Sequence, residues 1–146
     1  MPTRSSEVEW KGNLARGSGT MALGSGAFEG SYSFASRFED GDGTNPEELI
    51  AAAHAGCFSM ALALALSEAG HEPESVKTTA RVTLDASGGK VAITRSDLST
   101  EVKADGLDNE EFQEYADEAK EGCAVSRALG AIEIGLEARL ASVPAG

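Results

Sequence analysis

Two cysteines have the most distinctive chemistry in this 146-residue chain. Cys57 lies inside a long apolar stretch, between Gly56 and Phe58. Cys123 lies at the start of a predicted helical turn, where unpaired N–H groups favour a thiolate. Either cysteine alone is compatible with a small core side chain. Together, one buried cysteine and one at an element junction are the minimum for a nucleophile and a resolving partner.

Other reaction chemistries find less support in the sequence. His54 precedes Cys57 by three residues, so the two could share a metal ion with His71 and Cys123. That spacing matches no familiar zinc motif. The sequence also has no glycine-rich phosphate loop and no nucleophilic serine elbow. These patterns favour cysteine chemistry without a metal, haem or nucleotide cofactor.

Composition restricts the partners and the compartment. The 24 acidic and 12 basic side chains give a formal net charge of -12, which repels phosphate backbones and anionic lipid heads. We therefore expect neither a nucleic acid nor a membrane partner. The first residues lack the apolar stretch of a signal peptide, which predicts a cytoplasmic protein. The apolar segment 49–66 is rich in alanine and contains His54 and Ser59, which is more typical of a buried helix than of a membrane span.

Short strands are expected in the first part of the chain. Residues 7–43 are rich in glycine and serine and contain short alternating segments, a pattern typical of antiparallel strands with tight turns. Within this pattern Arg37 is a solvated strand residue, with Phe34 and Phe38 on the opposite face.

A long helix is predicted over residues 46–69. Asn45 suits the N-cap position, proline suits the first helical position, and Glu47 and Glu48 suit the positive end of the helix dipole. Gly70 is the expected stop. Because the segment is apolar on every face, we expect this helix to be buried on all sides.

The rest of the chain alternates between strands and helices. The expected elements are a hairpin of strands 76–85 and 90–103 with a bulge in its second strand, helices 108–121 and 125–129, and a last strand over 132–140. This order predicts a single domain over residues 1–146 with an α+β fold around one buried helix.

Two sequence motifs resemble a known family. The segments TNPEELIAAAHAGCFSMAL (44–62) with RFE (37–39), and AKEGCAVS (119–126), strongly resemble the OsmC branch of the OsmC/Ohr family of bacterial hydroperoxide-resistance proteins. The resemblance extends from Trp10 to the last strand and departs at Ala124, where the family usually has proline. It implies an OsmC-like fold: antiparallel sheets wrapped around a long buried central helix, in an intertwined symmetric dimer.

The resemblance also implies roles for four residues. Cys57 would be the peroxidatic nucleophile and Cys123 the resolving cysteine. Arg37 would be the cation beside the thiolate, where a planar guanidinium can also hydrogen-bond the peroxide oxygens. Glu47 would be the carboxylate that orients Arg37.

Spacing alone leaves the choice of glutamate open. If Asn45 is the N-cap, Glu48 occupies the capping-box position and Glu47 is free for another role; if Thr44 is the cap, the two glutamates exchange roles. Glu47 and Cys57 are ten residues apart on one helix, which is about 15 Å along its axis. If both serve one site, they come from different chains of a symmetric dimer.

The expected activity is that of a thiol-dependent peroxidase that reduces organic hydroperoxides to alcohols. The family resemblance implies a dithiol reductant such as dihydrolipoamide and a role in oxidative or osmotic stress. Phe58, Met60 and neighbouring leucines would give the site an apolar wall that favours organic peroxides. The alternative is a non-catalytic binding protein that holds a small apolar ligand in the dimer cavity, with both cysteines as core residues.

Overall fold

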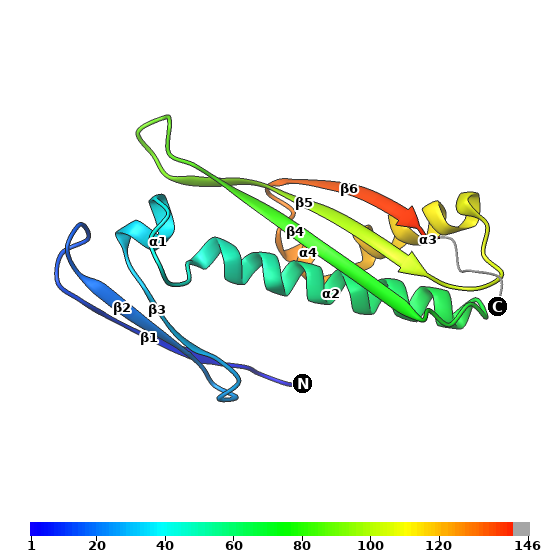
Figure 1. Ribbon diagram of the computed structural model, residues 1–146, viewed down its shortest axis with the longest axis horizontal. Helices are drawn as coiled ribbons and strands as arrows, with labels where there is room; N and C mark the ends of the chain where they lie inside the picture. Colours follow the sequence, from blue (N-terminus) through cyan, green and yellow to red (C-terminus); the bar gives the residue numbers. More distant parts are fainter. Residues whose placement is uncertain (142–146) are drawn as a thin grey trace. The chain divides into compact units, whose positions relative to one another are not determined.

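The computed structural model of the protein describes residues 1–141 (Figure 1). The chain divides into two units, Met1–Leu49 and Ile50–Gly146, and each is described by itself. Both units combine strands with helices, which confirms the α+β class. The expectation of a single domain over residues 1–146 stays a prediction.

The first unit contains a three-stranded antiparallel sheet of β1 (Ser6–Lys11), β2 (Ser18–Leu23) and β3 (Glu29–Tyr32). Gly19 of β2 lies opposite Trp10 on one side and Tyr32 on the other. The two rings meet edge to face across it, with centroids 5.2 Å apart. A Cβ at Gly19 would collide with both rings, so the glycine lets these aromatic side chains pack over the middle strand.

A short helix follows the sheet where the sequence predicted a strand. Helix α1 spans Phe34–Phe38, and Ser33 and Ser36 form a reciprocal capping box at its start. The rings of Phe34 and Phe38 pack against each other with centroids 4.8 Å apart, as residues one helical turn apart can. The expectation that Arg37 lies on a strand, with these two rings on its other face, is therefore wrong.

The long helix α2 spans Pro46–Glu68, close to its predicted range. Asn45 caps it, since its Oδ1 accepts a hydrogen bond from the Glu48 N–H at 2.8 Å. Gly70 follows the helix with φ +88°, the left-handed conformation expected of a C-terminal stop.

The second unit contains a sheet of β4 (Ser75–Asp85), β5 (Ala92–Lys103) and β6 (Glu133–Leu140), in that order. The predicted bulge is confirmed, because Thr83 pairs with Arg95 and Leu84 with Ile93, which leaves one extra residue in β5. Strands β5 and β6 pair in parallel, so the sheet is mixed and the expectation of wholly antiparallel sheets is wrong here. Helices α3 (Asn109–Gly122) and α4 (Ala124–Ala128) form the crossover that a parallel pair requires.

The core of this unit lies between the sheet and the helices. A stripe of α2 with a spacing of four residues is fully buried, and it packs with the inward residues of β5 and α3. Asp108 caps α3 as predicted, with its Oδ1 2.9 Å from the Glu111 nitrogen. The buried members of this core are Phe58, Leu62 and Leu66 from α2, Leu98 and Val102 from β5, Phe112, Ala116 and Ala119 from α3, and Ala104, Leu107 and Cys123 from the connecting segments.

The other face of α2 is open in this single chain. Met60 and Leu64 are 76% and 60% exposed, so the helix is not buried on all sides by its own chain. By length and composition α2 would pass as a membrane span, but the core helix of a soluble protein passes the same test. Figure 1 shows α2 running along the sheet of β4, β5 and β6.

Candidate active site

Arg37 and Glu47 form an ion pair in the first unit. The Arg37 Nε and Nη2 atoms both donate to Glu47 Oε1, at 3.0 and 2.8 Å. The Glu47 side chain is 9% exposed and the Arg37 side chain 31% exposed. The carboxylate thus fixes one edge of the guanidinium, and within residues 1–141 its remaining N–H groups have no hydrogen-bond partner and can donate to a bound molecule.

Local hydrogen bonds place α1 beside the start of α2. The Ser36 hydroxyl donates to the Thr44 carbonyl at 2.8 Å, and Asn45 Nδ2 donates to the Ser36 carbonyl at 3.1 Å. Gly43, between these helices, has φ +119°, and a Cβ there would lie 2.6 Å from the Ser31 carbonyl oxygen. The turn therefore requires glycine, and it brings Arg37 to the first turn of α2.

The two adjacent glutamates have different partners. Asn45 is the cap, so Glu48 occupies the capping-box position, where its carboxylate accepts a hydrogen bond from the Thr44 hydroxyl at 2.8 Å. Glu47 pairs with Arg37. Glu47, rather than Glu48, is thus the carboxylate that contacts Arg37, and its role in a reaction stays a prediction.

An aromatic cavity adjoins Arg37. It has a volume of about 220 Å³ and is lined by Trp10, Leu14, Tyr32, Ser33, Phe34, Arg37 and Phe38. The Arg37 guanidinium carbon lies 5.3 Å from the centre of the Phe38 ring. The cavity thus combines apolar walls with one cation, an arrangement suited to a small ligand with an apolar body and an electronegative end.

Cys57 and Cys123 lie together in the second unit. Both are free thiols; Cys123 is buried and Cys57 half-buried against the same core cluster. Cys57 lies close enough to Cys123 to lower the pKa of the Cys123 thiol. The structure thus brings the two predicted redox residues into contact across 66 positions of sequence.

The surroundings of Cys123 favour its thiolate. Burial alone would raise the pKa of Cys123, but hydrogen bonds from the Ser126 N–H, the Cys57 thiol, the Ser126 hydroxyl and the Val125 N–H outweigh burial and lower it. Cys123 is the residue that precedes α4, as predicted, and Ala124 takes the first helical position. The missing proline at 124 therefore leaves the thiol in place.

His54 is a residue of this site that the sequence analysis considered only as a metal ligand. Its ring is fully buried. Nδ1 lies 2.7 Å from the Ser96 Oγ, and Nε2 lies 2.8 Å from the Ser126 Oγ. Burial lowers the pKa of His54. The signal in the sequence was a histidine four residues before Phe58 on the buried stripe of α2, a position that requires polar partners.

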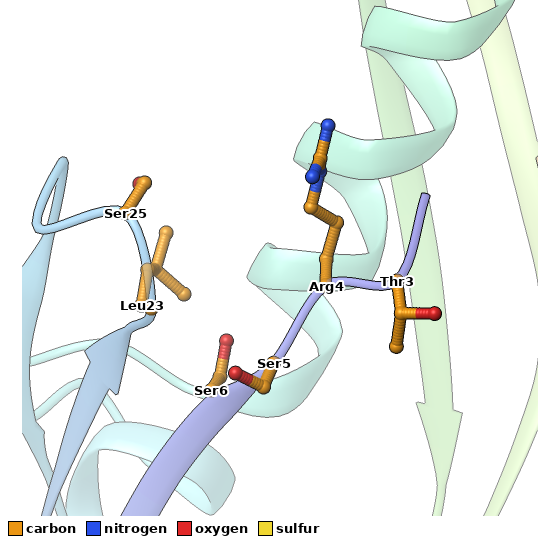
Figure 2. A pocket seen from close by; sticks show the side chains of 7 residues that line it. Thr3, Arg4, Ser5, Ser6, Leu23 and Ser25 are labelled. Carbon is orange, nitrogen blue, oxygen red and sulfur yellow. The ribbon is translucent and has the colours of Figure 1, made fainter. Parts of the chain in front are cut away.

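The open depression near the N-terminus is lined by no cysteine, histidine or carboxylate side chain. Its volume is about 670 Å³, and Arg4 is its only charged side chain. Figure 2 shows that Arg4 and the hydroxyls of Ser5, Ser6 and Ser25 supply most of its polar atoms. None of the predicted site residues lines it.

The site residues fall into two pairs. Arg37 and Glu47 meet in the first unit, and Cys57 meets Cys123 in the second. The expected apolar wall of Phe58 and Met60 is not formed, because Phe58 faces the core and Met60 lies on the exposed face of α2. The aromatic cavity beside Arg37, which the sequence analysis missed, supplies apolar walls from Trp10, Tyr32, Phe34 and Phe38.

An α+β chain with two contacting thiols and a partly buried arginine–carboxylate pair has the features of a cysteine redox protein. The family model described as OsmC-like protein matches residues 39–137. The chain is 48% identical over 137 residues to Peroxiredoxin OsmC of Escherichia coli K12. The aligned region covers 93% of this chain and 95% of that protein. The chain therefore belongs to the OsmC family.

Further relatives carry names from the same family. Organic hydroperoxide resistance protein-like 1 of Staphylococcus saprophyticus is 39% identical over 98 residues, or 64% of this chain and 67% of that protein. The crystal structure of the organic hydroperoxide resistance protein OhrB of Bacillus subtilis matches with a TM-score of 0.68 and 29% identity, over 92% of this chain and 98% of that one. These matches confirm the family resemblance and the fold.

Proposed function

We propose that this protein is a cysteine-based peroxidase that reduces organic hydroperoxides to alcohols. The observation that carries the proposal is the contact between its only two cysteines, one of which has a lowered pKa. The 48% identity to a protein named Peroxiredoxin OsmC supports the same activity.

The reaction would begin at Cys57. Its thiolate attacks the terminal oxygen of the hydroperoxide, the O–O bond breaks, and the alkoxide takes up a proton to leave as an alcohol. Cys57 is then a sulfenic acid. Cys123 attacks that sulfur, the S–S bond forms, and the hydroxyl leaves as water. An external dithiol, for which dihydrolipoamide is our candidate, reduces the disulfide and restores both thiols.

The Arg37–Glu47 pair would serve this reaction across a dimer. Glu47 and Cys57 are ten residues apart on α2, about 15 Å along the helix axis, so one chain cannot bring both to one point. Two copies of α2 that cross antiparallel about a two-fold axis would bring Arg37 and Glu47 of one chain to Cys57 of the other. The exposed apolar face of α2, with Met60 and Leu64, supports this homodimer.

The surroundings of Arg37 support an organic substrate. The aromatic cavity would receive the apolar part of the hydroperoxide, while free N–H groups of Arg37 bind its oxygens. The reaction needs no metal, haem or nucleotide. We propose a cytoplasmic location, where thiol reductants are available, and a role in oxidative or osmotic stress.

A turnover assay with the two serine variants tests the proposal. With cumene hydroperoxide and a dithiol, Cys57→Ser should lose all turnover because the nucleophile is gone. Cys123→Ser should react once and stop at the sulfenic acid or over-oxidise. Full turnover in Cys57→Ser would end the peroxidase proposal.

The second candidate is a binding protein for a small apolar ligand. The aromatic cavity beside Arg37 favours it, since such walls bind apolar molecules without any reaction. The two candidates differ in a free-thiol count after one equivalent of hydroperoxide. A binding protein keeps both thiols.

A further inference from the structure

The buried histidine of α2 has no part in the reaction described so far. His54 is completely enclosed, and both of its ring nitrogens have a partner. Nδ1 lies 2.7 Å from the Ser96 Oγ of β5, and Nε2 lies 2.8 Å from the Ser126 Oγ of α4. The two serines are buried as well. Since no ring nitrogen is left for a substrate, His54 connects three elements of the second unit; we call this set of contacts the Ser96–His54–Ser126 bridge.

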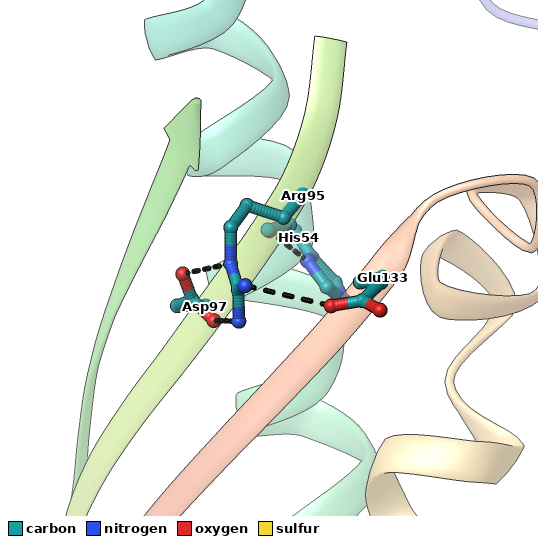
Figure 3. Close-up of polar contacts among 5 residues, drawn as sticks. His54, Arg95, Asp97 and Glu133 are labelled. Carbon is teal, nitrogen blue, oxygen red and sulfur yellow. Dashed lines mark hydrogen bonds and ion pairs between the residues drawn. The ribbon is translucent and has the colours of Figure 1, made fainter. Parts of the chain in front are cut away.

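The bridge is made of neutral groups. The charged residues next to Ser96 lie on the other face of β5: Arg95 binds Asp97 and Glu133 there, as Figure 3 shows, with His54 behind the strand. In a neutral imidazole one ring nitrogen donates a hydrogen bond and the other accepts one, and a serine hydroxyl can do either. Both contacts of His54 can therefore exist at the same time.

Helix α4 has few other anchors. It contains only five residues, Ala124–Ala128, and no side chain caps its start. A helix this short is not stable by itself. Within residues 1–141, the Ser126 hydroxyl makes the only side-chain hydrogen bond that joins α4 to another helix or strand, and Val125 adds packing against the core. The bridge therefore determines where α4 lies against α2.

Each cysteine lies within one helical turn of the bridge. His54 and Cys57 are three residues apart on α2, which is about 4.5 Å along its axis. Ser126 and Cys123 are also three residues apart, and Cys123 belongs to the same turn, because its carbonyl accepts a hydrogen bond from the Arg127 N–H at 3.0 Å. Cys57 packs against the buried cluster that contains Cys123. The hydrogen bond between α2 and α4 thus lies next to the place where the two thiols come together.

We propose that His54 is a positioning residue that fixes Cys123 beside Cys57. Through Ser126 it holds the first turn of α4 against α2, and it thereby keeps the buried Cys123 side chain within reach of Cys57. The effect is one of distance and order. Because the two thiols are already in place, less conformational freedom is lost when they form a disulfide. Without the bridge, α4 can move away from α2 and take Cys123 with it.

The consequence for the reaction rests on the proposed function. Once Cys57 is a sulfenic acid, the Cys123 thiolate attacks its sulfur, the S–S bond forms and the S–O bond breaks. The departing hydroxide takes up the proton that Cys123 released on ionisation, so one water molecule leaves. A Cys123 that is already in place makes this step faster than a second oxidation of Cys57. The bridge would thus protect Cys57 from over-oxidation.

The test measures the Cys57–Cys123 disulfide at equilibrium with oxidised and reduced dithiothreitol. The exchange oxidises the two protein thiols to a disulfide and reduces the cyclic disulfide of dithiothreitol to its dithiol, so no peroxide is needed and the result is independent of the proposed peroxidase activity. His54→Asn should lower the equilibrium constant by about tenfold, the contribution of one buried hydrogen bond, because the shorter amide can reach Ser96 but not Ser126. Ser126→Ala should lower it by a similar factor.

A matched variant and a control complete the design. The longer amide of His54→Gln takes the place of Nε2, so it can still bind Ser126, and the equilibrium constant should stay within about twofold of the wild-type value. A general loss of stability would affect the Asn and Gln variants alike, so the difference between them reports the contact with α4. Ser59→Ala removes a hydroxyl from the same helix that bonds Thr78 instead, and it should leave the equilibrium unchanged.

Two results would overturn the proposal. One is an unchanged equilibrium constant in His54→Asn. The other is an equal decrease in His54→Gln, which would mean that the contact with Ser126 has no special effect. If the His54 variants fail to fold, Ser126→Ala tests the same hydrogen bond from its other end, and an unchanged constant there refutes the bridge. Variants that shift the equilibrium as expected, in a protein that reduces no hydroperoxide, would support the bridge and contradict only the proposed function.

Discussion

Glu47 and Glu48 are identical neighbours with different contacts. Glu47 accepts two hydrogen bonds from Arg37, while Glu48 accepts one from Thr44 at the helix start. If the Arg37 guanidinium serves the reaction, only the first carboxylate holds it in place. Single amide substitutions can therefore separate a catalytic positioning effect from a loss of helix capping.

We expect Glu47→Gln to lower kcat/KM for an organic hydroperoxide by roughly tenfold or more, since Arg37 loses its charged anchor. Glu48→Gln is the matched control and should retain nearly full activity. Both variants should be compared by steady-state turnover and by thermal unfolding. Equal losses of activity in the two variants would contradict the assignment of Glu47.

His54 gives the fold a pH dependence with a defined sign. Burial lowers the pKa of His54 in the folded protein below its unfolded value of about 6.5. Below that pH the unfolded chain takes up a proton at this residue and the folded chain does not, so the free energy of unfolding falls as the pH drops. The contribution is complete above about pH 6.5 and is lost toward the folded pKa.

Denaturant unfolding between pH 7.5 and pH 5 measures this effect. The wild-type protein should lose up to about 1.4 kcal/mol per pH unit at this residue. His54→Asn, although less stable throughout, should show a smaller decline. Parallel slopes in wild type and His54→Asn would show that His54 does not titrate differently on unfolding.

Candidate site residues could be predicted from the sequence where their neighbours in the chain indicate their chemistry. Cys57 and Cys123 were identified by their chemistry, and Glu47 by the cap at Asn45 together with the family resemblance. The hydrogen bonds of His54 could not be predicted from the sequence, because its two partners lie 42 and 72 residues away in the chain. Only the folded sheet and α4 bring those hydroxyls to the ring.

The elements differ in how far local sequence determines them. Helices α2 and α3 have apolar patterns and side-chain caps, and both were predicted within a few residues. Helix α1 is five residues long, and its capping box uses two serines, a signal easily taken for a turn. The parallel pairing of β5 and β6 depends on the α3–α4 crossover, so no local pattern in β6 could indicate it.

The middle strand of the first sheet offers a test at the scale of one element. Gly19→Val places a side chain where the rings of Trp10 and Tyr32 now meet, and a Cβ there would come within 2.8 Å of the indole. We expect a loss of about 1–3 kcal/mol in the free energy of unfolding. Because Trp10 is the only tryptophan, its emission should also shift to longer wavelength.

Gly88→Ala is the matched control for this substitution. A Cβ at Gly88 meets no atom within 4 Å. The control should therefore leave both the Trp10 emission and the stability of the protein nearly unchanged. Wild-type fluorescence and stability in Gly19→Val would show that the rings do not require the glycine.

At the scale of the whole molecule, one apolar helix face stays open in the single chain. Met60 and Leu64 are one turn apart on α2 and largely exposed, and a second copy of the helix would cover them. The proposed dimer also unites the Arg37–Glu47 pair with Cys57. If so, the peroxidase activity requires that two chains associate.

We expect the wild-type protein to behave in light scattering as a dimer of 15.0 kDa chains. Met60→Glu with Leu64→Glu should yield monomers that keep their folded circular dichroism but lose most peroxidase turnover. Val91→Glu, which alters another exposed apolar residue, should stay dimeric and active. A fully active Met60→Glu, Leu64→Glu monomer would show that the site is complete within one chain.

The central claim is that Cys57 and Cys123 form one disulfide when the protein reduces an organic hydroperoxide. The direct measurement adds one equivalent of cumene hydroperoxide to the reduced protein, followed by a free-thiol count, intact mass and peptide mapping. We predict the loss of both thiols, a mass decrease of about 2 Da, and a peptide that links Cys57 to Cys123 of the same chain. Two intact thiols with unconsumed hydroperoxide would contradict the account.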